Sequence, residues 1–397
     1  MNDNRLANRV FYFEESQTLE MAKKARELSA QGVKVINLSL GEPDFATPKH
    51  IIDAAKKAMD NGFTKYTPVA GFADLRQAIS EKFLLENGLH YAPEQIVVST
   101  GAKHSVMNTI LALINPGDEV IVPTPFWVSY SEMIKLSSGV PVFVKSNFEN
   151  NYKSPAADFE AAITSRTKMF LFSSPCNPSG SVYTKQELKE IADVFAKYPD
   201  IYIVSDEIYE HINFVSKHES IGQFESIADR VITVNGVSKA FAMTGWRIGY
   251  IGAPLFIAKA CEKLQGQFTS GANSIAQKAS LAAITGYMEP TKQMASEFLK
   301  RRNLLLKRFE EIPEVKTNVP DGAFYLFPDF SYYIGKTLKG IQIHSTRELC
   351  YYMLNEAHVS MVSGEAFGNP ECIRISYSVN ESDLNYAMNR IIAALHS

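Results

Sequence analysis

Residues 238–250 read SKAFAMTGWRIGY, and this stretch decides how the rest of the chain is interpreted. An apolar run with the composition of a buried strand, residues 231–234, precedes it, and a second such run, residues 247–251, closes it. Lys239 therefore stands just beyond the end of an expected strand. Ligands of open α/β sheets bind beyond the carboxyl ends of the strands, so this position favours a binding site. A single lysine, by contrast, is most often a solvated surface charge.

Further apolar runs, separated by helical patterns, extend outward from this stretch. The alternation begins near residue 47 and continues to about residue 290. The runs are apolar on both faces, as buried parallel strands require, and the pattern predicts an α/β fold with residues 47–290 as its large domain. The expected strands are residues 96–99, 120–123, 141–145, 169–173, 202–205, 231–234 and 247–251.

Capping signals mark two of the helices. Thr47 and Pro48 have the residue types of a helix start, and Gly62 is suited to ending that helix. Thr184, with Glu187 three residues later, is a capping box that opens another helix.

The character of the chain changes after about residue 290. We expect residues 291–397 to form a second, smaller α+β domain, joined by the amino-terminal residues 1–46. Its expected elements are helices at residues 292–309 and 381–395 and strand-like pieces at residues 324–327 and 373–378.

The composition is that of a soluble globular protein. The formal net charge of −3 gives no reason to expect nucleic acid or an anionic membrane surface as partner. No stretch approaches the roughly 18 apolar residues of a membrane-spanning helix, and the amino terminus lacks an apolar signal core, so we expect a cytoplasmic protein. Widely spaced cysteines fit neither a disulfide framework nor a zinc site, and we expect no metal and four buried thiols: Cys176, Cys261, Cys350 and Cys372.

Polar residues with complementary chemistry follow the expected central strands. Asn177 lies in SSPCNPSG, and Asp206 and Tyr209 lie in SDEIY. A cofactor with a pyridine nitrogen, a phenolic oxygen and an aldehyde needs a partner for each group. Asp206 would keep the nitrogen protonated, Tyr209 and Asn177 would bind the phenolic oxygen, and Lys239 would form a Schiff base and move a proton. Each residue alone has a simpler role, and an aspartate after a strand more often caps a turn.

The cofactor's phosphate has its own candidates. Gly101, Ala102 and Lys103 lead from a strand into a helix, so backbone N–H groups and the helix dipole would face an anion. Ser238 offers a hydroxyl, and Arg247 offers a charged planar fork of donors. A plain connection between strand and helix remains the alternative for the turn at Gly101.

These motifs, in this order and spacing, resemble those of the class I aminotransferases of the fold-type-I pyridoxal-phosphate superfamily. The resemblance also includes LSLGEPDF (residues 38–45), KYTPVAGFADLR (65–76) and IRISYSVN (373–380), and so covers nearly the whole chain. It implies pyridoxal 5'-phosphate as cofactor and a mostly parallel seven-stranded sheet between helices. It also implies amino-acid and 2-oxo-acid substrates and a homodimer with shared active sites.

The same resemblance assigns roles to individual residues. Lys239 would be the Schiff-base lysine, Asp206 the partner of the ring nitrogen, and Tyr209 and Asn177 the partners of the phenolic oxygen. The remaining assignments are Trp127 stacked on the ring, Arg374 clamping the substrate α-carboxylate with help from the backbone near Gly41, and Tyr66 reaching the phosphate of the neighbouring subunit. Simpler alternatives are a core aromatic for Trp127, a loop anchor for Tyr66 and a structural ion pair for Arg374.

Within this family the chain is most similar to the bacterial branch of aspartate aminotransferases. Ser16, Thr18 and Lys103 match residues that help that branch select acidic side chains, although Ser16 and Thr18 could instead cap a helix that begins near Leu19. Aspartate would then pass its amino group to 2-oxoglutarate. The motifs leave open an aspartate/prephenate or aromatic aminotransferase and a carbon–sulfur lyase of the same fold. A ligand-sensing regulator would need a basic DNA-binding region, for which there is no room before residue 40.

Other catalytic chemistries have no support in the sequence. The motifs GxGxxG, GxxxxGK[ST], HExxH and GxSxG do not occur. The His218-Glu219 pair lacks a second histidine at helical spacing, and we expect it at the surface.

Overall fold

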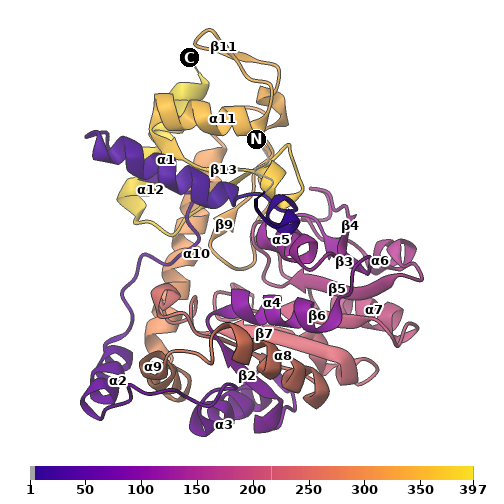
Figure 1. Cartoon of the computed structure of the whole chain (residues 1–397). Coiled ribbons are helices and arrows are strands. Elements are labelled where there is room, and N and C mark those ends of the chain that lie inside the picture. Colours follow the sequence, from indigo (N-terminus) through magenta and orange to yellow (C-terminus); the bar gives the residue numbers. More distant parts are fainter. Residues whose placement is uncertain (1–4, 216, 397) are drawn as a thin grey trace.

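The computed structural model describes residues 5–215 and 217–396. Its largest feature is a seven-stranded sheet with the order β2-β8-β7-β6-β5-β3-β4, which runs through the lower part of the molecule in Figure 1. The prediction of an α/β fold with a mostly parallel seven-stranded sheet is therefore confirmed. The strands are β2 (Ile96–Ser99), β3 (Glu119–Pro123), β4 (Val140–Val144), β5 (Thr167–Ser173), β6 (Tyr202–Asp206), β7 (Val231–Gly236) and β8 (Gly249–Gly252).

Strand β8 is the exception to the parallel order. It pairs antiparallel with both β7 and β2, whereas the other four pairings are parallel. The segment between β7 and β8 contains no crossover helix, and a parallel pairing would need one. The strand also begins two residues later than expected, because Arg247 adopts a left-handed conformation with φ 57°.

Helices bury both faces of the sheet. In β5, Met169 and Leu171 share a hydrophobic cluster with residues of α4 and α8, whereas Phe170 and Phe172 share another with residues of α6 and α7. This alternation explains why the strands are apolar on both faces. The helices around the sheet are α2 (Lys49–Asp60), α3 (Ala73–Lys82), α4 (Ala102–Leu113), α5 (Ser129–Leu136), α6 (Ala156–Ala162), α7 (Lys185–Ala196), α8 (Leu255–Phe268) and α9 (Ser274–Thr285).

A separate core holds the two ends of the chain together. Met21 and Ala25 of α1 pack in one cluster with residues of α10, α11 and α12, and α10 runs from the sheet region up into this part (Figure 1). Its elements are α1 (Gln17–Ala30), α10 (Glu289–Phe309), α11 (Thr346–Tyr352), α12 (Glu381–Leu395), the parallel pair β1 (Ile36–Asn37) and β12 (Val359–Ser360), the sheet of β13 (Val362–Ser363), β14 (Ile373–Ser376) and β9 (Tyr325–Leu326), and the hairpin of β10 (Thr337–Leu338) and β11 (Ile341–Gln342).

One of the two predicted caps is present. Thr184 Oγ1 accepts from the Glu187 N–H at 3.2 Å, and Glu187 Oε2 accepts from the Thr184 N–H at 2.7 Å. The expectation for Thr47 was wrong, because α2 begins at Lys49 after Pro48. The Thr47 hydroxyl instead donates to the Ala242 carbonyl at 2.7 Å, a tertiary contact with the loop that follows β7.

Two further features complete the fold. Among the described residues, no helix is both long enough and apolar enough to cross a membrane. All four cysteines are free; three are buried as expected, but Cys176 is only partly buried.

Candidate functional site

A cavity of about 300 Å³ lies between the carboxyl ends of the central strands and the part of the molecule that contains α1 and β14. It collects side chains from distant parts of the sequence, including the end of β6, the loop after β7, the start of α4 and strand β14. Thirteen of the fifteen predicted site residues line it: Ser16, Thr18, Gly41, Ala102, Lys103, Trp127, Asn177, Asp206, Tyr209, Ser238, Lys239, Arg247 and Arg374. Gly101 adjoins the cavity through Arg247, whereas Tyr66 lies elsewhere.

Asp206 provides a buried carboxylate at one end of the cavity. It is the last residue of β6 and is only 4% exposed. Tyr130 donates a hydrogen bond from Oη to Asp206 Oδ2 at 2.7 Å. Burial raises the pKa of Asp206 to about 6, although the hydrogen bond from Tyr130 opposes this shift. No described lysine or arginine forms an ion pair with this carboxylate, so a protonated ring nitrogen would be a suitable partner.

Lys239 provides an amine with an altered pKa. It follows β7 by three residues, and its Nζ donates to the carbonyl oxygen of Gly41 at 2.5 Å. The ammonium also lies 5.7 Å from the ring centre of Tyr209. Burial lowers the pKa of Lys239 to about 8, so that about a tenth of the amine is neutral at pH 7. A neutral amine is the form that attacks an aldehyde.

Arg374 is a buried cation at another side of the cavity. Its Nη1 donates to Asn177 Oδ1 at 3.0 Å, and its Nη2 donates to the carbonyl oxygen of Ser39 at 2.5 Å. The rings of Tyr325 and Phe367 flank the guanidinium at 4.7 and 4.9 Å. Within the described part of the chain, no carboxylate lies within ion-pair distance of Arg374. A buried arginine without a counter-charge is suited to binding a carboxylate ligand.

The amino terminus of α4 forms a positively polarised corner. Gly101 precedes the helix with φ 86°, and a Cβ at this position would overlap the guanidinium of Arg247. The backbone of Gly249 packs directly against the start of α4, because a Cβ at Gly249 would overlap the backbone of Ala102. Burial and the neighbouring charge of Arg247 lower the pKa of Lys103. Two cations and free N–H groups at a helix start favour a phosphate-sized anion.

Trp127 lies between this corner and Tyr130. The Lys103 ammonium is 5.3 Å from the Trp127 ring centre, and Trp127 meets Tyr130 edge-on at 5.4 Å. Trp127 lines the cavity and is only partly buried, so part of its ring is available to a ligand.

Ser16 and Thr18 reach the cavity from the start of α1. Ser16 occupies the N-cap position, but its side chain makes no capping hydrogen bond. Thr18 Oγ1 is buried and has no hydrogen-bond partner among the described residues. The capping alternative therefore finds no support, and Thr18 presents an unused hydroxyl at the cavity.

Two residues of the site escaped the sequence reasoning. Tyr130 binds Asp206, and Tyr325 places its hydroxyl 2.7 Å from that of Tyr209. Tyr325 lies in an apolar stretch where an aromatic is expected in the core. Tyr130 lies at the start of α5, 76 residues from Asp206, and no sequence spacing connects the two.

The expectation that His218 lies at the surface was wrong. Its side chain is 8% exposed, and its Nε2 lies 2.9 Å from Glu207 Oε2. The pairing was not visible in the sequence, because Glu207 and His218 are brought together by the fold.

The cavity residues fit pyridoxal 5'-phosphate. A buried carboxylate without an ion-pair partner, an amine of lowered pKa and a positively polarised helix start are the partners of its ring nitrogen, aldehyde and phosphate. The donors Tyr209 and Asn177 line the same cavity, as the phenolic oxygen requires.

Comparisons with known proteins agree with this fit. A family model described as aminotransferase class I and II matches residues 33–391. A bifunctional aspartate aminotransferase and glutamate/aspartate-prephenate aminotransferase of Petunia hybrida is 46% identical over 99% of this chain and 83% of its own length. An aspartate/prephenate aminotransferase of Nitrosomonas europaea is 44% identical over 98% of this chain and 100% of its own.

Solved structures give the same result. The aspartate aminotransferase of Rhizobium meliloti superposes with a TM-score of 0.95, with 40% identity over 98% of both chains. The Thermus thermophilus aspartate aminotransferase with maleate gives 0.92, with 38% identity over the full length of both. Fold and site thus define a pyridoxal-phosphate-dependent transferase of fold type I. The chain belongs to the class I and II aminotransferases, and the predictions of family, fold and cofactor are confirmed.

Proposed function

We propose that the protein moves the amino group of aspartate to 2-oxoglutarate. The observation that carries this proposal is that Ser16, Thr18 and Lys103 line the same cavity as Lys239 and Arg374. A dicarboxylic substrate needs one cation for its α-carboxylate and further donors for its side-chain carboxylate. Arg374 would supply the first, and the other three residues would supply the second. The names of the relatives support the same substrate.

The catalytic roles follow from the positions of the side chains. When bound, pyridoxal 5'-phosphate supplies an aldehyde that takes up the amino group and a ring that accepts electrons. Lys239 would hold the aldehyde between turnovers and then move a proton at the α carbon of the amino acid. Asp206 would hold the ring nitrogen in its protonated form, and Tyr209 and Asn177 would bind the phenolic oxygen. Ser238 and Arg247 would hold the phosphate together with the backbone of Gly101, Ala102 and Lys103.

Trp127 and Gly41 would contact the bound cofactor and substrate. Trp127 would cover one face of the cofactor ring, since it lines the cavity beside Lys103. The carbonyl of Gly41 accepts from the Lys239 ammonium, and the backbone near Gly41 would help Arg374 to bind the substrate α-carboxylate.

Prephenate or an aromatic keto acid is a second candidate substrate. Relatives at 44–46% identity are named as aspartate/prephenate or bifunctional aminotransferases. A site that accepts both acidic and aromatic side chains needs mobile polar groups. Ser16 and Thr18 lie at the start of α1, on a different element from the loop after β7 that carries Lys239.

A homodimer in the cytoplasm is also part of this proposal. Tyr66 is 94% exposed and lies outside the cavity of its own chain. It would reach the phosphate in a second copy. Inactive Lys239→Ala and Tyr66→Ala proteins, mixed and re-assembled, should then recover activity, because one of the two sites in a mixed dimer has both residues intact. Absence of recovery would place Tyr66 outside the site.

The chain would divide into two domains. Residues 47–290 would form the large cofactor-binding domain, and residues 1–46 with 291–397 the small one. The hydrophobic core formed mainly by α1, α10, α11 and α12 supports this division, and Ile208, Tyr209 and Ile212 of the large domain pack against it.

A substrate screen tests the proposal directly. The protein loaded with pyridoxal 5'-phosphate is mixed with aspartate, glutamate, phenylalanine or a cysteine conjugate, each with a 2-oxo acid acceptor, and with prephenate as a further acceptor. Aspartate with 2-oxoglutarate should give glutamate at the highest kcat/KM. Pyruvate and ammonia from the cysteine conjugate, without glutamate, would instead identify a lyase.

Lys103 provides a matched variant for specificity. Lys103→Met should lower kcat/KM for aspartate by about 10–100-fold while leaving phenylalanine within a few-fold, since one charge-assisted contact is worth about 1.5–3 kcal/mol. An equal loss for both substrates would assign Lys103 to the phosphate alone.

A further inference from the structure

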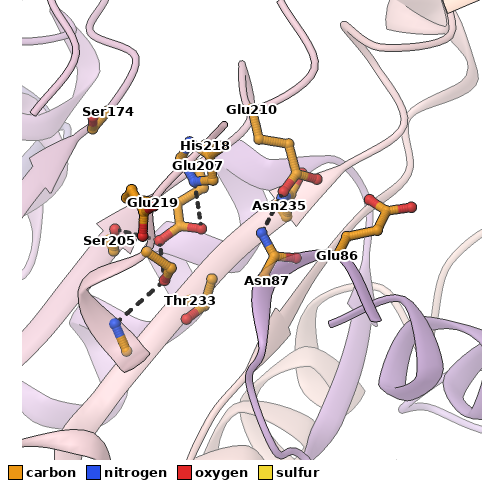
Figure 2. Close-up of polar contacts among 12 residues, drawn as sticks. Glu86, Asn87, Ser174, Ser205, Glu207, Glu210, His218, Glu219, Thr233 and Asn235 are labelled. Atoms are coloured by element: carbon orange, nitrogen blue, oxygen red, sulfur yellow. Dashed lines mark hydrogen bonds and ion pairs between the residues drawn. The ribbon is translucent and has the colours of Figure 1, made fainter. Parts of the chain in front are cut away.

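The turn after β6 presents side chains to two different environments. Asp206 and Tyr209 line the cavity, whereas their neighbours Glu207 and Glu210 do not. Figure 2 shows Glu207 and Glu210 among a second set of buried polar side chains, with His218 against Glu207 and Asn87 against Glu210. The proposed function uses none of these residues.

Glu207 is surrounded by donors. It is 1% exposed, and its Oε1 accepts from Ser205 Oγ at 2.9 Å and from Ser220 Oγ at 2.6 Å. Its Oε2 lies 2.9 Å from His218 Nε2. Three donor groups thus surround the Glu207 carboxyl group. The structure therefore places a buried carboxylate directly after Asp206 in the chain.

Glu210 already has a cation of its own. The Lys82 ammonium contacts Glu210 Oε1 and donates to Asn87 Oδ1 at 2.8 Å, while Asn87 Nδ2 donates to Glu210 Oε2 at 2.8 Å. Lys82 and Glu210 are both buried. Lys82 also lies 3.5 Å from Glu86 Oε2, so its charge is shared by two carboxylates and does not balance Glu207 as well.

Among the described residues, His218 is the remaining group that contacts Glu207 and can carry a positive charge. Its other charged neighbours are Glu210 and Lys82, which pair with each other. Burial is the largest single influence and lowers the pKa of His218, but the charge of Glu207, the hydrogen bond to Glu207 and the charge of Glu210 together outweigh it, and the net pKa is raised. The Nδ1 atom is buried without a partner among the described residues, so the contact with Glu207 is the one polar contact that orients the ring.

We propose that His218 is a positioning residue for the charge state of the cofactor site: as an imidazolium it neutralises Glu207 and thereby helps Asp206 to stay ionised. This inference rests on the proposed function, in which Asp206 must carry a negative charge to hold a protonated ring nitrogen.

The groups around Asp206 explain why the neighbour's charge matters. Burial is the largest influence on its pKa, and the hydrogen bonds from Tyr130 Oη and from the Ile208 N–H oppose it. The negative charge of Glu207 adds to the rise, and the positive charge of Lys239 subtracts from it. Because the pKa of Asp206 lies at about 6, a change in any of these charges alters its ionised fraction near neutral pH.

The test uses three variants of the full-length protein: His218→Gln, Glu207→Gln and the double variant. Glutamine retains an N–H donor where His218 has Nε2, but it removes the charge. The dissociation constant for pyridoxal 5'-phosphate is measured by tryptophan fluorescence at several pH values. The quantity compared is the pH midpoint below which this constant rises. The same midpoint is measured in the single-turnover rate with aspartate. Ionisations of the cofactor itself are common to all four proteins and cancel in the comparison.

The two single variants should shift this midpoint in opposite directions. His218→Gln leaves Glu207 uncompensated and should raise the midpoint by roughly half to one pH unit. Glu207→Gln removes the negative charge and should lower it, and the double variant should return close to wild type. A purely structural role would lower the melting temperature of both single variants without opposite shifts.

His211→Gln is the matched control. Its ring lies in the same segment, 2.9 Å from the outer Glu86 and 3.4 Å from Glu210, and is not a neighbour of Glu207. Its midpoint should equal that of wild type. Shifts in the same direction for both single variants, or unchanged midpoints in both, would overturn the inference. If His218→Gln fails to fold, an unshifted midpoint in Glu207→Gln overturns it alone. Wild-type protein that neither binds the cofactor nor transfers an amino group would overturn the proposed function, and with it this inference.

Discussion

The hydroxyl oxygen of Tyr325 lies 2.7 Å from the hydroxyl oxygen of Tyr209, and both side chains are buried. The Tyr325 ring also lies 4.7 Å from the guanidinium of Arg374, and its hydroxyl occupies the space where a Cβ on Gly41 would stand. One side chain therefore contacts the partner proposed for the phenolic oxygen, the cation proposed for the substrate carboxylate, and the backbone that holds Lys239.

Tyr325→Phe should separate these contacts. The variant keeps the ring beside Arg374 but leaves the buried Tyr209 hydroxyl without its partner, at a cost of about 1 kcal/mol. We expect kcat/KM for aspartate to fall about 5–10-fold, with little change in melting temperature. Tyr333→Phe is the control, since the Tyr333 hydroxyl contacts the Pro313 carbonyl at 3.4 Å, away from the cavity. An unchanged kcat/KM in Tyr325→Phe would show that the hydroxyl pair has no part in turnover.

Arg374→Lys tests the carboxylate site. Lysine keeps the charge but loses the planar fork, and it cannot reach Asn177 and the Ser39 carbonyl at the same time. We expect KM for aspartate and for 2-oxoglutarate to rise about 30–100-fold, with a smaller effect on kcat, corresponding to about 2–3 kcal/mol of lost binding.

The contrasting variant for Arg374 is Arg302→Lys. Arg302 lies on α10, and its Nη1 donates to the Pro320 carbonyl at 2.7 Å. Both KM values of Arg302→Lys should stay within two-fold of wild type. Equal changes in the two lysine variants would mean that Arg374 acts through stability and not through substrate binding.

The fold was predictable where it depends on local pattern. The expected strands appear, and most of them are apolar because they are buried between two helical layers. The edge strand β4 is the exception, since Val140 and Phe143 are exposed. The antiparallel direction of β8 was not predicted, because strand direction depends on the connection and not on the composition of the strand. Thr47 was misassigned for a related reason: its hydroxyl binds the distant Ala242 carbonyl, and local capping rules do not include such contacts.

The candidate site divides in the same way. Asp206 ends a strand, Lys239 follows one and Arg374 lies inside β14, and the fold brings them to one cavity. Tyr325 stands in an apolar run, FYLF, where its polar partner is 116 residues away. A tyrosine with such a distant partner has the same sequence context as a core aromatic. His218 was misread because its partner Glu207 becomes a neighbour only after folding.

Lys239→Ala should remove both the visible absorbance of the loaded protein and its activity. The absorbance requires a bond between this amine and the aldehyde, and the reaction requires a base within reach of the α carbon. We expect turnover to fall at least about 10³-fold, as measured by glutamate formation and by absorption spectra. Lys189→Ala is the control, because Lys189 is an exposed lysine paired with Asp193 on α7. A visible band that persists in Lys239→Ala would move the Schiff base to another lysine.

Asp206→Asn should stabilise the cofactor-free protein while weakening cofactor binding. Burial raises the pKa of Asp206 to about 6, above its unfolded value of about 3.9. The folded chain therefore binds this proton more tightly, and the stability that the proton contributes is lost as the pH rises from about 4 to about 6. At pH 7 the buried charge costs about 3 kcal/mol, part of which asparagine would return.

We expect Asp206→Asn to raise the free energy of unfolding at pH 7 by about 1–2 kcal/mol and to flatten its dependence on pH between 4 and 6. Urea unfolding of the cofactor-free protein at several pH values measures both effects. Asp193→Asn changes an exposed aspartate paired with Lys189 and should leave the pH dependence intact. A wild-type pH dependence of the free energy of unfolding in Asp206→Asn would contradict this expectation. The buried Asp206 carboxylate would then not be the group that destabilises the cofactor-free protein near pH 7. The proposed partnership between this carboxylate and a protonated ring nitrogen would lose its electrostatic basis.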